Sequence, residues 1–122
     1  MILLMTKLFS KWAFSQNVDE KEFSVALTEV QSGKFEANLG GYLYKKRIRF
    51  KGKGKSGSAR TIICYKKDDR AIFIYGFAKN EKSNLSKKEF LALKEFSKIL
   101  FNLSAEEIKI AVENGDFIEV KA

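Results

Sequence analysis

Two apolar runs joined by a short polar connection place the strongest limit on the fold. They cover residues 61–65 (TIICY) and 71–77 (AIFIYGF), and both are rich in β-branched and aromatic residues. A connection as short as 67–70 (KDDR) joins antiparallel strands, and runs without polar alternation are typical of strands that are buried on both faces. The sequence therefore predicts a β-hairpin in the middle of a sheet, and the absence of proline leaves the strands their backbone donors.

A short apolar run and two helical patterns precede this hairpin. Residues 2–5 (ILLM) are expected to form a buried first strand. Apolar residues then recur with helical spacing in two sets, at Leu8, Phe9, Trp12 and Ala13, and at Phe23, Ala26, Leu27 and Val30. Asp19 is the expected N-cap of the second helix, with Glu22 three residues later, and Gly33 is its expected end.

Two capping signatures follow the hairpin. Ser86 with Glu89, and Ser104 with Glu107, each have the spacing of a capping box and predict two further helices. The inward residues of the first of these helices are expected to be Phe90, Leu93, Phe96 and Leu100. Residues 117–120 are expected to add an edge strand.

The segment between the first two helices and the hairpin has the pattern of strands. Residues 35–39 alternate up to a turn at Gly40 and Gly41, and residues 43–50 alternate loosely. With 122 residues, of which 45% are hydrophobic, the chain fits a single domain spanning residues 1–122. The predicted fold is α+β, with a small twisted antiparallel sheet, helices packed on one face and the other face free to carry charge.

Positive charge is concentrated in one segment. Residues 45–60 (KKRIRFKGKGKSGSAR) carry eight basic residues and no acidic one, and residues 37–67 carry ten. The rest of the chain holds 13 basic and 15 acidic residues, so the formal charge of +8 is +10 in this segment and −2 elsewhere. Such segregation indicates a localised patch for a polyanion, because scattered lysines would not leave the remainder acidic.

The cysteine and histidine content argues against several kinds of site. There is no histidine and a single cysteine, Cys64, so neither an intrachain disulfide nor a structural zinc site is expected, and no metal or other cofactor is predicted. Cys64 lies in an apolar run and is expected to be a buried small hydrophobe. The apolar N-terminal run is too short for a signal peptide or a spanning helix, so a cytoplasmic protein without membrane attachment is expected.

The cationic segment includes a strand whose basic residues share a face. Three of them are spaced by two and are expected to project from the same side of the sheet: Lys45, Arg47 and Arg49. Lys46 is expected on the opposite side. If the returning strand places Arg60 across from the row, and Lys79 reaches the same face, several cations converge on one phosphate.

The glycine-rich stretch at 52–58 (GKGKSGS) looks like a phosphate-binding loop, but it does not satisfy that motif. A Walker pattern that ended at Lys55 and Ser56 would need a glycine where Arg49 stands, and it would lead from a strand into a helix. This stretch leads from strand to strand. The favoured interpretation is a loop whose glycines let the backbone approach a sugar-phosphate chain while Lys53 and Lys55 supply charge.

Three motifs stand in order along the chain: GGxLxKxR at 40–47, GKGKSGxxR at 52–60 and YGFAKNEKSNL at 75–85. Together they resemble RelE/HigB-like toxins of type II toxin–antitoxin systems, in the branch of the RelE/ParE superfamily with a GKGKSG loop. The resemblance covers nearly the whole chain, including the helix around Trp12. It implies the small α+β fold of that superfamily.

The resemblance also implies an activity and a set of partners. Toxins of this kind cleave mRNA in the ribosomal A site without a metal ion and so inhibit translation. The implied partners are the ribosome, mRNA and a cognate helix-turn-helix antitoxin that neutralises the toxin.

By the same resemblance, the catalytic positions of the family fall on Lys45, Arg47, Arg60 and Lys79. Lys45 or Lys79 is the candidate general base, because neighbouring positive charge favours a neutral amine. The two arginines are candidate charge stabilisers, since a guanidinium does not readily give up its proton. The general acid stays open, with Tyr75 as one candidate. RNA binding is assigned to Arg49, Lys51, Lys53 and Lys55.

Two alternative functions stay open. A non-enzymatic RNA- or ribosome-binding module would use the same patch only to hold phosphates. A ParE-like toxin directed at DNA gyrase would share the fold, because one fold hosts several functions. A protein target would not require Lys45, Arg47 and Arg60 to converge, which favours the endoribonuclease.

Overall fold

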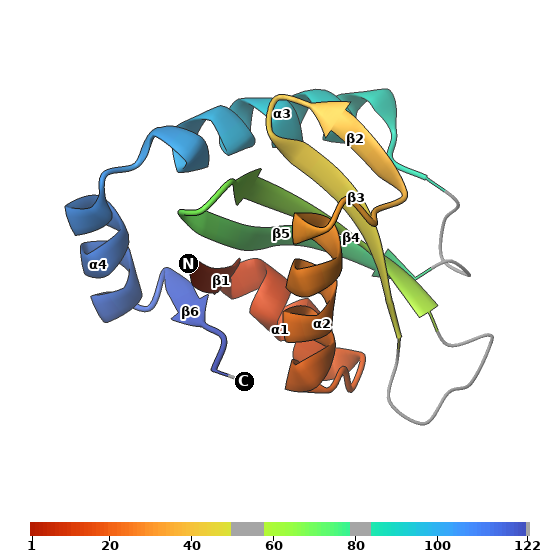
Figure 1. The fold of residues 1–122 in the computed structure, drawn as a ribbon, viewed down its shortest axis with the longest axis horizontal. Helices are drawn as coiled ribbons and strands as arrows, with labels where there is room; N and C mark the ends of the chain where they lie inside the picture. The colour runs from red at the N-terminus through yellow and green to blue at the C-terminus, as the bar shows by residue number, and fades with distance from the viewer. Residues whose placement is uncertain (50–57, 79–83, 122) are drawn as a thin grey trace.

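The computed structural model describes residues 1–49, 58–78 and 84–121, which form one sheet flanked by helices (Figure 1). In chain order the elements are β1 (Ile2–Thr6), α1 (Lys7–Ser15), α2 (Glu20–Gln31), β2 (Ala37–Gly40), β3 (Leu43–Arg49), β4 (Ser58–Lys66), β5 (Arg70–Ala78), α3 (Lys87–Asn102), α4 (Ala105–Glu113) and β6 (Phe117–Glu119). The α+β class is confirmed.

The predicted hairpin forms the middle of the sheet. The strand order is β2-β3-β4-β5-β1-β6, so β4 and β5 have neighbours on both sides. All strand pairs are antiparallel except β1 with β5, which run parallel. The first strand and the edge strand β6 lie where the sequence predicts them, and the sheet is mostly antiparallel as expected.

Helices cover both faces of the sheet, not one as predicted. In Figure 1, α3 runs above the strands while α1 and α2 lie below them. Each face has its own apolar core. Phe9 of α1, Phe23 of α2 and Phe73 of β5 belong to one core, and Ile62 of β4 and Leu100 of α3 belong to the other. The two-sided burial follows from the apolar runs of the hairpin, because strands without polar alternation need cover on both faces.

A β-bulge in β5 decides which way its side chains face. Ile62 pairs with Tyr75 whereas Ile63 pairs with Phe73, so Ile74 is an extra residue. A bulge shifts the alternation of side chains by one position. Phe73 therefore packs on the α1 side and Tyr75 on the α3 side.

Gly76 lies next to the bulge and meets Trp12 of α1. A Cβ atom at this position would lie 2.4 Å from Trp12 Cζ3 and 2.6 Å from Cε3, much closer than two carbon atoms approach without repulsion. Trp12 also packs against Phe9, with ring centroids 5.5 Å apart. Glycine is therefore required where the indole lies on the strand backbone.

The predicted helix ends are confirmed, although two apolar residues are exposed. Capping boxes form at the starts of α3 and α4, Asp19 caps α2, and Gly33 follows α2 with a φ of +87°. Phe96 is expected to face inward but is 38% exposed, and Leu8, which belongs to the apolar pattern of α1, is 78% exposed. The apolar stripe of each helix is wider than the strip that the sheet covers.

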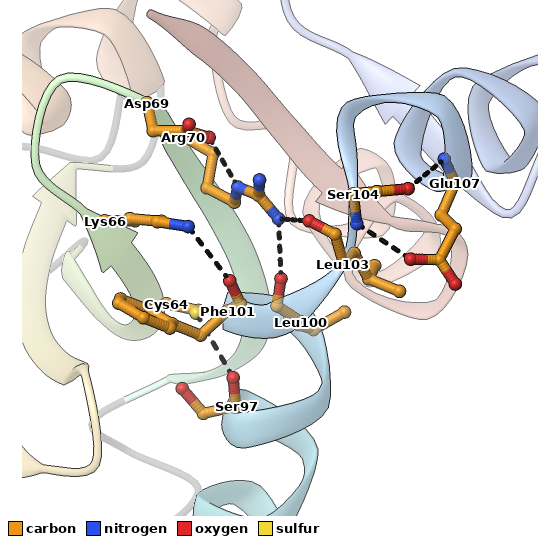
Figure 2. Close-up of polar contacts among 10 residues, drawn as sticks. All are labelled: Cys64, Lys66, Asp69, Arg70, Ser97, Leu100, Phe101, Leu103, Ser104 and Glu107. Carbon is orange, nitrogen blue, oxygen red and sulfur yellow. Dashed lines mark hydrogen bonds and ion pairs between the residues drawn. The ribbon is translucent and has the colours of Figure 1, made fainter.

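Arg70, at the start of β5, holds the C-terminal end of α3 (Figure 2). Its buried Nη1 donates to the carbonyl oxygens of Leu100 at 3.0 Å and Leu103 at 2.6 Å, and its Nε donates to Asp69 Oδ1 at 2.6 Å. The last carbonyls of a helix lack partners within it, so Arg70 supplies donors from another element. The hydrogen bond from Arg70 also holds the pKa of the Asp69 carboxyl below its usual range.

Cys64 and Ser97 join β4 to the middle of α3 (Figure 2). Both are fully buried, and Cys64 Sγ donates to the Ser97 carbonyl at 3.7 Å. Ser97 Oγ in turn donates to the Gly41 carbonyl at 2.9 Å. Cys64 is thus the buried, unbridged cysteine that the sequence predicts, and burial raises the pKa of its thiol.

The contact between Gly76 and Trp12 predicts a steric cost. Gly76→Ala should lower the free energy of unfolding by about 1–3 kcal/mol, because the new methyl group overlaps the indole. Urea denaturation measures the change. In a Trp12→Leu background the same substitution should cost less, since the obstacle is gone. Equal costs in the two backgrounds would contradict the steric explanation.

The contacts of Arg70 predict a larger loss. Arg70→Met should lower the free energy of unfolding by about 2–4 kcal/mol, because the carbonyls of Leu100 and Leu103 lose buried donors. Lys66→Met is the matched control: Lys66 Nζ donates to the Phe101 carbonyl at 3.5 Å from a less buried position, and its loss should cost only about 0.5–1.5 kcal/mol. Equal losses in urea denaturation would refute the role assigned to Arg70.

Candidate nucleic-acid interface

Four basic side chains from β3 and β4 lie on the α3 side of the sheet, and we call them the cationic face: Lys45, Arg47, Arg49 and Arg60. The residues between them in β3, Lys46 and Ile48, turn to the α2 side. Arg60 lies directly across from Arg47 in the register of the two strands. The two-residue spacing seen in the sequence thus corresponds to one face of the sheet.

Arg60 is the least satisfied member of the cationic face. It is half-buried, and its Nη1 is buried without a hydrogen-bond partner in the described part of the chain. An unsatisfied buried polar atom costs about 1–3 kcal/mol, and like charges directly across two strands repel. An anion bound between Arg47 and Arg60 would remove both costs.

Two acidic residues, Glu29 and Glu36, contact β3. Glu29 of α2 forms an ion pair with Lys46 on the other side of the sheet, with Oε1 3.2 Å from Nζ. The Glu36 carboxylate accepts a hydrogen bond from the backbone N–H of Arg47. Lys66, at the far end of β4, contacts Phe101 of α3. The described basic residues of the segment 37–67 therefore do not all belong to the cationic face.

β5 adds two aromatic residues beside the cationic face. Phe77 pairs with Arg60 and Tyr75 pairs with Ile62, and the two rings lie 6.1 Å apart between centroids. The Tyr75 hydroxyl donates a hydrogen bond of 2.6 Å to Glu89 Oε2 in the first turn of α3. The aromatic pair thus connects the cationic face to the start of α3.

Four of the predicted site residues lie outside the described residues: Lys51, Lys53, Lys55 and Lys79. Among the predicted residues that the structure describes, it places Lys45, Arg47, Arg49 and Arg60 on one face. The roles assigned to all eight residues stay predictions.

Within the described ranges there is neither a metal-binding cluster nor a membrane-spanning helix. No group of three or more His, Cys, Asp or Glu side chains there is placed to hold a metal ion. None of the helices described combines the length and the apolar character needed to cross a membrane.

A comparison with protein families matches nearly the whole chain. The model of the family described as RelE toxin of RelE / RelB toxin-antitoxin system covers residues 1–120. The chain belongs to the RelE toxin family. It is the toxin of a toxin–antitoxin system, as the sequence motifs implied, and its place in the HigB-like branch stays a prediction. A search of curated proteins found no match.

Sequence reasoning missed the link between Tyr75 and Glu89 in this RelE-family toxin. Each residue was recognised separately, one in a strand and the other in a capping box. Their contact depends on the bulge at Ile74 and on the packing of α3 against the sheet. The spacing of residues in the sequence does not encode that packing. The only sequence signal for it is a tyrosine beside a predicted cationic strand.

The strain at Arg60 predicts an unusual mutational effect on this RelE-family toxin. Arg60→Met should leave the free energy of unfolding unchanged or raise it by up to about 1 kcal/mol, because it removes repulsion with Arg47 and an unsatisfied donor. Urea denaturation in a buffer without phosphate or sulfate measures this change. Lys46→Met is the matched control and should lower the free energy of unfolding by up to about 1 kcal/mol, since the exposed Glu29 loses its partner. Equal losses would show that Arg60 stabilises the free protein.

Proposed function

We propose that this toxin is a ribosome-dependent endoribonuclease that cleaves mRNA in the ribosomal A site and thereby inhibits translation. The observation that carries the proposal is the pairing of Arg47 with Arg60, whose buried Nη1 has no partner among the described residues. Two adjacent guanidinium groups suit a phosphate, which accepts several charge-assisted hydrogen bonds. Family membership supports the proposal, because RelE toxins are generally endoribonucleases.

The proposed reaction needs charge stabilisation and two proton transfers. The ribose 2′-hydroxyl gives its proton to a base as its oxygen attacks the adjacent phosphorus and a new O–P bond forms. The bond from phosphorus to the 5′-oxygen breaks, and this oxygen takes up a proton from a general acid that stays unassigned. Arg47 and Arg60 stabilise the negative charge that develops on the phosphate. Lys45 and Lys79 are the candidate bases, and the arginines stay protonated throughout.

The remaining basic residues position the RNA. We assign binding of the mRNA or ribosomal RNA backbone to Arg49, Lys51, Lys53 and Lys55. Contacts to phosphates fix orientation without reading sequence, so these residues hold the RNA while the paired arginines act on one phosphate.

We also propose the location and the partners of this toxin. The chain acts as one RelE-like domain over residues 1–122, in the cytoplasm where ribosomes and mRNA are found. A cognate helix-turn-helix antitoxin neutralises it. Neither a metal ion nor another cofactor takes part in the proposed reaction.

The test is a translation reaction with ribosomes programmed with a defined mRNA. The wild type should cut the mRNA in the A site, and Arg60→Ala should cut at least about 100-fold more slowly, because one preorganised charge contributes this much to a transition state. Lys67→Ala is the control, since Lys67 is exposed in the turn between β4 and β5, away from the cationic face. Primer extension on the mRNA locates the cut.

Two outcomes would contradict the proposal. Intact mRNA with wild-type toxin bound to the ribosome would favour a module that only binds RNA. Equal cleavage by wild type and Arg60→Ala would remove Arg60 from the catalytic centre.

A further inference from the structure

Tyr42, in the turn between β2 and β3, has a backbone conformation that tyrosine seldom adopts. Its φ is +67°, and it follows Gly40 and Gly41, whose φ values are +78° and +58°. A left-handed backbone suits glycine or asparagine and is unfavourable for a bulky side chain. Strain of this kind is found most often at functional positions. The ring of Tyr42 is therefore a candidate for a role beyond the fold.

The ring of Tyr42 is stacked on another ring and is still largely exposed. It lies almost parallel to the ring of Phe101 in α3, with centroids 3.5 Å apart and an angle of 11° between the planes. Carbon atoms in contact are about 3.5–4.0 Å apart, so the two rings overlap without a sideways offset, as successive bases do in a nucleic-acid strand. Phe101 covers one face of the Tyr42 ring. Because Tyr42 is 47% exposed, its other face can receive a third ring. We call Tyr42 and Phe101 the aromatic stack.

Two lysines bring positive charge to the aromatic stack. Lys66 Nζ lies 4.8 Å from the centroid of the Phe101 ring and donates to the carbonyl oxygen of the same residue (Figure 2). Lys94 of α3 lies across the turn that precedes Tyr42. A Cβ atom at Gly41 would be 3.2 Å from Lys94 Cε, and one at Gly40 would be 3.8 Å from Lys94 Nζ. The two glycines therefore let the lysine side chain pass close over the backbone.

The aromatic stack lies on the same side of the sheet as the cationic face. Tyr42 directly precedes β3, and its contact with Phe101 of α3 places its ring on the α3 side. The backbone from Tyr42 to Arg47 spans about 16 Å, at about 3.3 Å per strand residue, and Lys45 lies between them on the same face. Lys94 and Phe101 are seven residues apart and so share one side of α3. An RNA strand that runs from the cationic face to Tyr42 would follow positive charge along its path.

We infer that the exposed face of Tyr42 binds an unpaired RNA base by stacking, while Lys66 and Lys94 bind phosphates beside it. The inference rests on the proposed function only in taking RNA as the ligand. Proteins that bind single strands combine aromatic rings with a positively charged surface, because every base has a π face that can stack. An unpaired base of mRNA and one of ribosomal RNA offer the same chemistry to this ring.

A base fits this surface better than an apolar protein segment does. A docked helix needs a groove lined by several apolar side chains, whereas the residues that precede Tyr42 in the turn are two glycines, crossed by the side chain of Lys94. One flat ring with lysines beside it offers a base a stacking surface and offers its phosphates charge. The GGxLxKxR motif at 40–47 thus combines this turn with the start of the cationic strand.

Two substitutions separate the ring of Tyr42 from the turn that carries it. Tyr42→Phe keeps a ring that can stack. Tyr42→Asn removes the ring, and because asparagine tolerates a left-handed backbone, the turn should keep its conformation. Phe14→Asn is the matched control, since Phe14 is an aromatic residue, 89% exposed, in α1 on the other side of the sheet. Urea denaturation checks that each variant is folded.

The experiment measures, by fluorescence anisotropy, the binding of a labelled single strand of about ten nucleotides. The strand is 2′-O-methyl RNA, which lacks the attacking hydroxyl and so stays intact, and a second strand has the same backbone without bases. The wild type and Tyr42→Phe should bind the strand with bases at least about fivefold more tightly than the abasic strand, as stacking of one base predicts. Tyr42→Asn should lose at least about fivefold in affinity for the strand with bases and keep its affinity for the abasic strand. Phe14→Asn should bind both strands as the wild type does.

The lysines are tested with the same two strands. Lys94→Gln should weaken the binding of both strands by the same factor and make it less dependent on salt, because a phosphate contact does not involve the base. Lys11→Gln is the matched control, since Lys11 is exposed in α1, and it should leave both affinities nearly unchanged.

Binding to ribosomes identifies the source of the base. Affinity is measured on ribosomes without mRNA and on ribosomes programmed with 2′-O-methyl mRNA. Weaker binding of Tyr42→Asn to both kinds of ribosome would assign the base to ribosomal RNA. Weaker binding only when mRNA is present would assign it to mRNA.

The outcomes separate this inference from the proposed function. Equal affinity of the wild type for the two strands would overturn the stacking role, and so would equal losses in Tyr42→Phe and Tyr42→Asn. Either result would leave cleavage at the paired arginines standing. A toxin that stacks bases on Tyr42 but leaves mRNA intact on the ribosome would support this inference and overturn the endoribonuclease.

Discussion

The register shift in β5 is the constraint on which the rest of the structure depends. One extra residue, Ile74, lets Phe73 enter the core under α1 and α2 while Tyr75 and Phe77 face α3. It also places Gly76 against the indole of α1. The same local irregularity thus serves both cores and supplies the aromatic edge of the cationic face. Bulges commonly reorient side chains next to functional sites.

Sequence patterns predicted the features that depend on local chemistry. The hairpin, the caps of α2, α3 and α4, and the spacing of Lys45, Arg47 and Arg49 all follow from residue type and periodicity. The features that sequence reasoning missed depend on packing between distant segments. They are the ion pair of Lys46 with Glu29, the contacts of Arg70 with α3, and helices on both faces of the sheet.

The arrangement of the cationic face lowers the stability of the free protein. Arg47 and Arg60 repel each other, and one nitrogen of Arg60 is buried without a partner among the described residues. Elsewhere the fold satisfies its buried cations, as Lys46 and Arg70 show. Strain confined to one small region and supported by a well-packed framework is typical of a site formed for a ligand.

Helix α3 is attached at both ends to the same strand. Arg70 begins β5 and holds the Leu100 carbonyl, and Tyr75, farther along β5, holds Glu89. The strand path from Arg70 to Tyr75 and the helix path from Glu89 to Leu100 are each about 16 Å long, from about 3.3 Å per strand residue and about 1.5 Å per helix residue. The length of the strand segment therefore matches the length of the helix segment. A residue inserted between the two contacts on either element would move one contact out of position. The lengths of these two segments can therefore change only together.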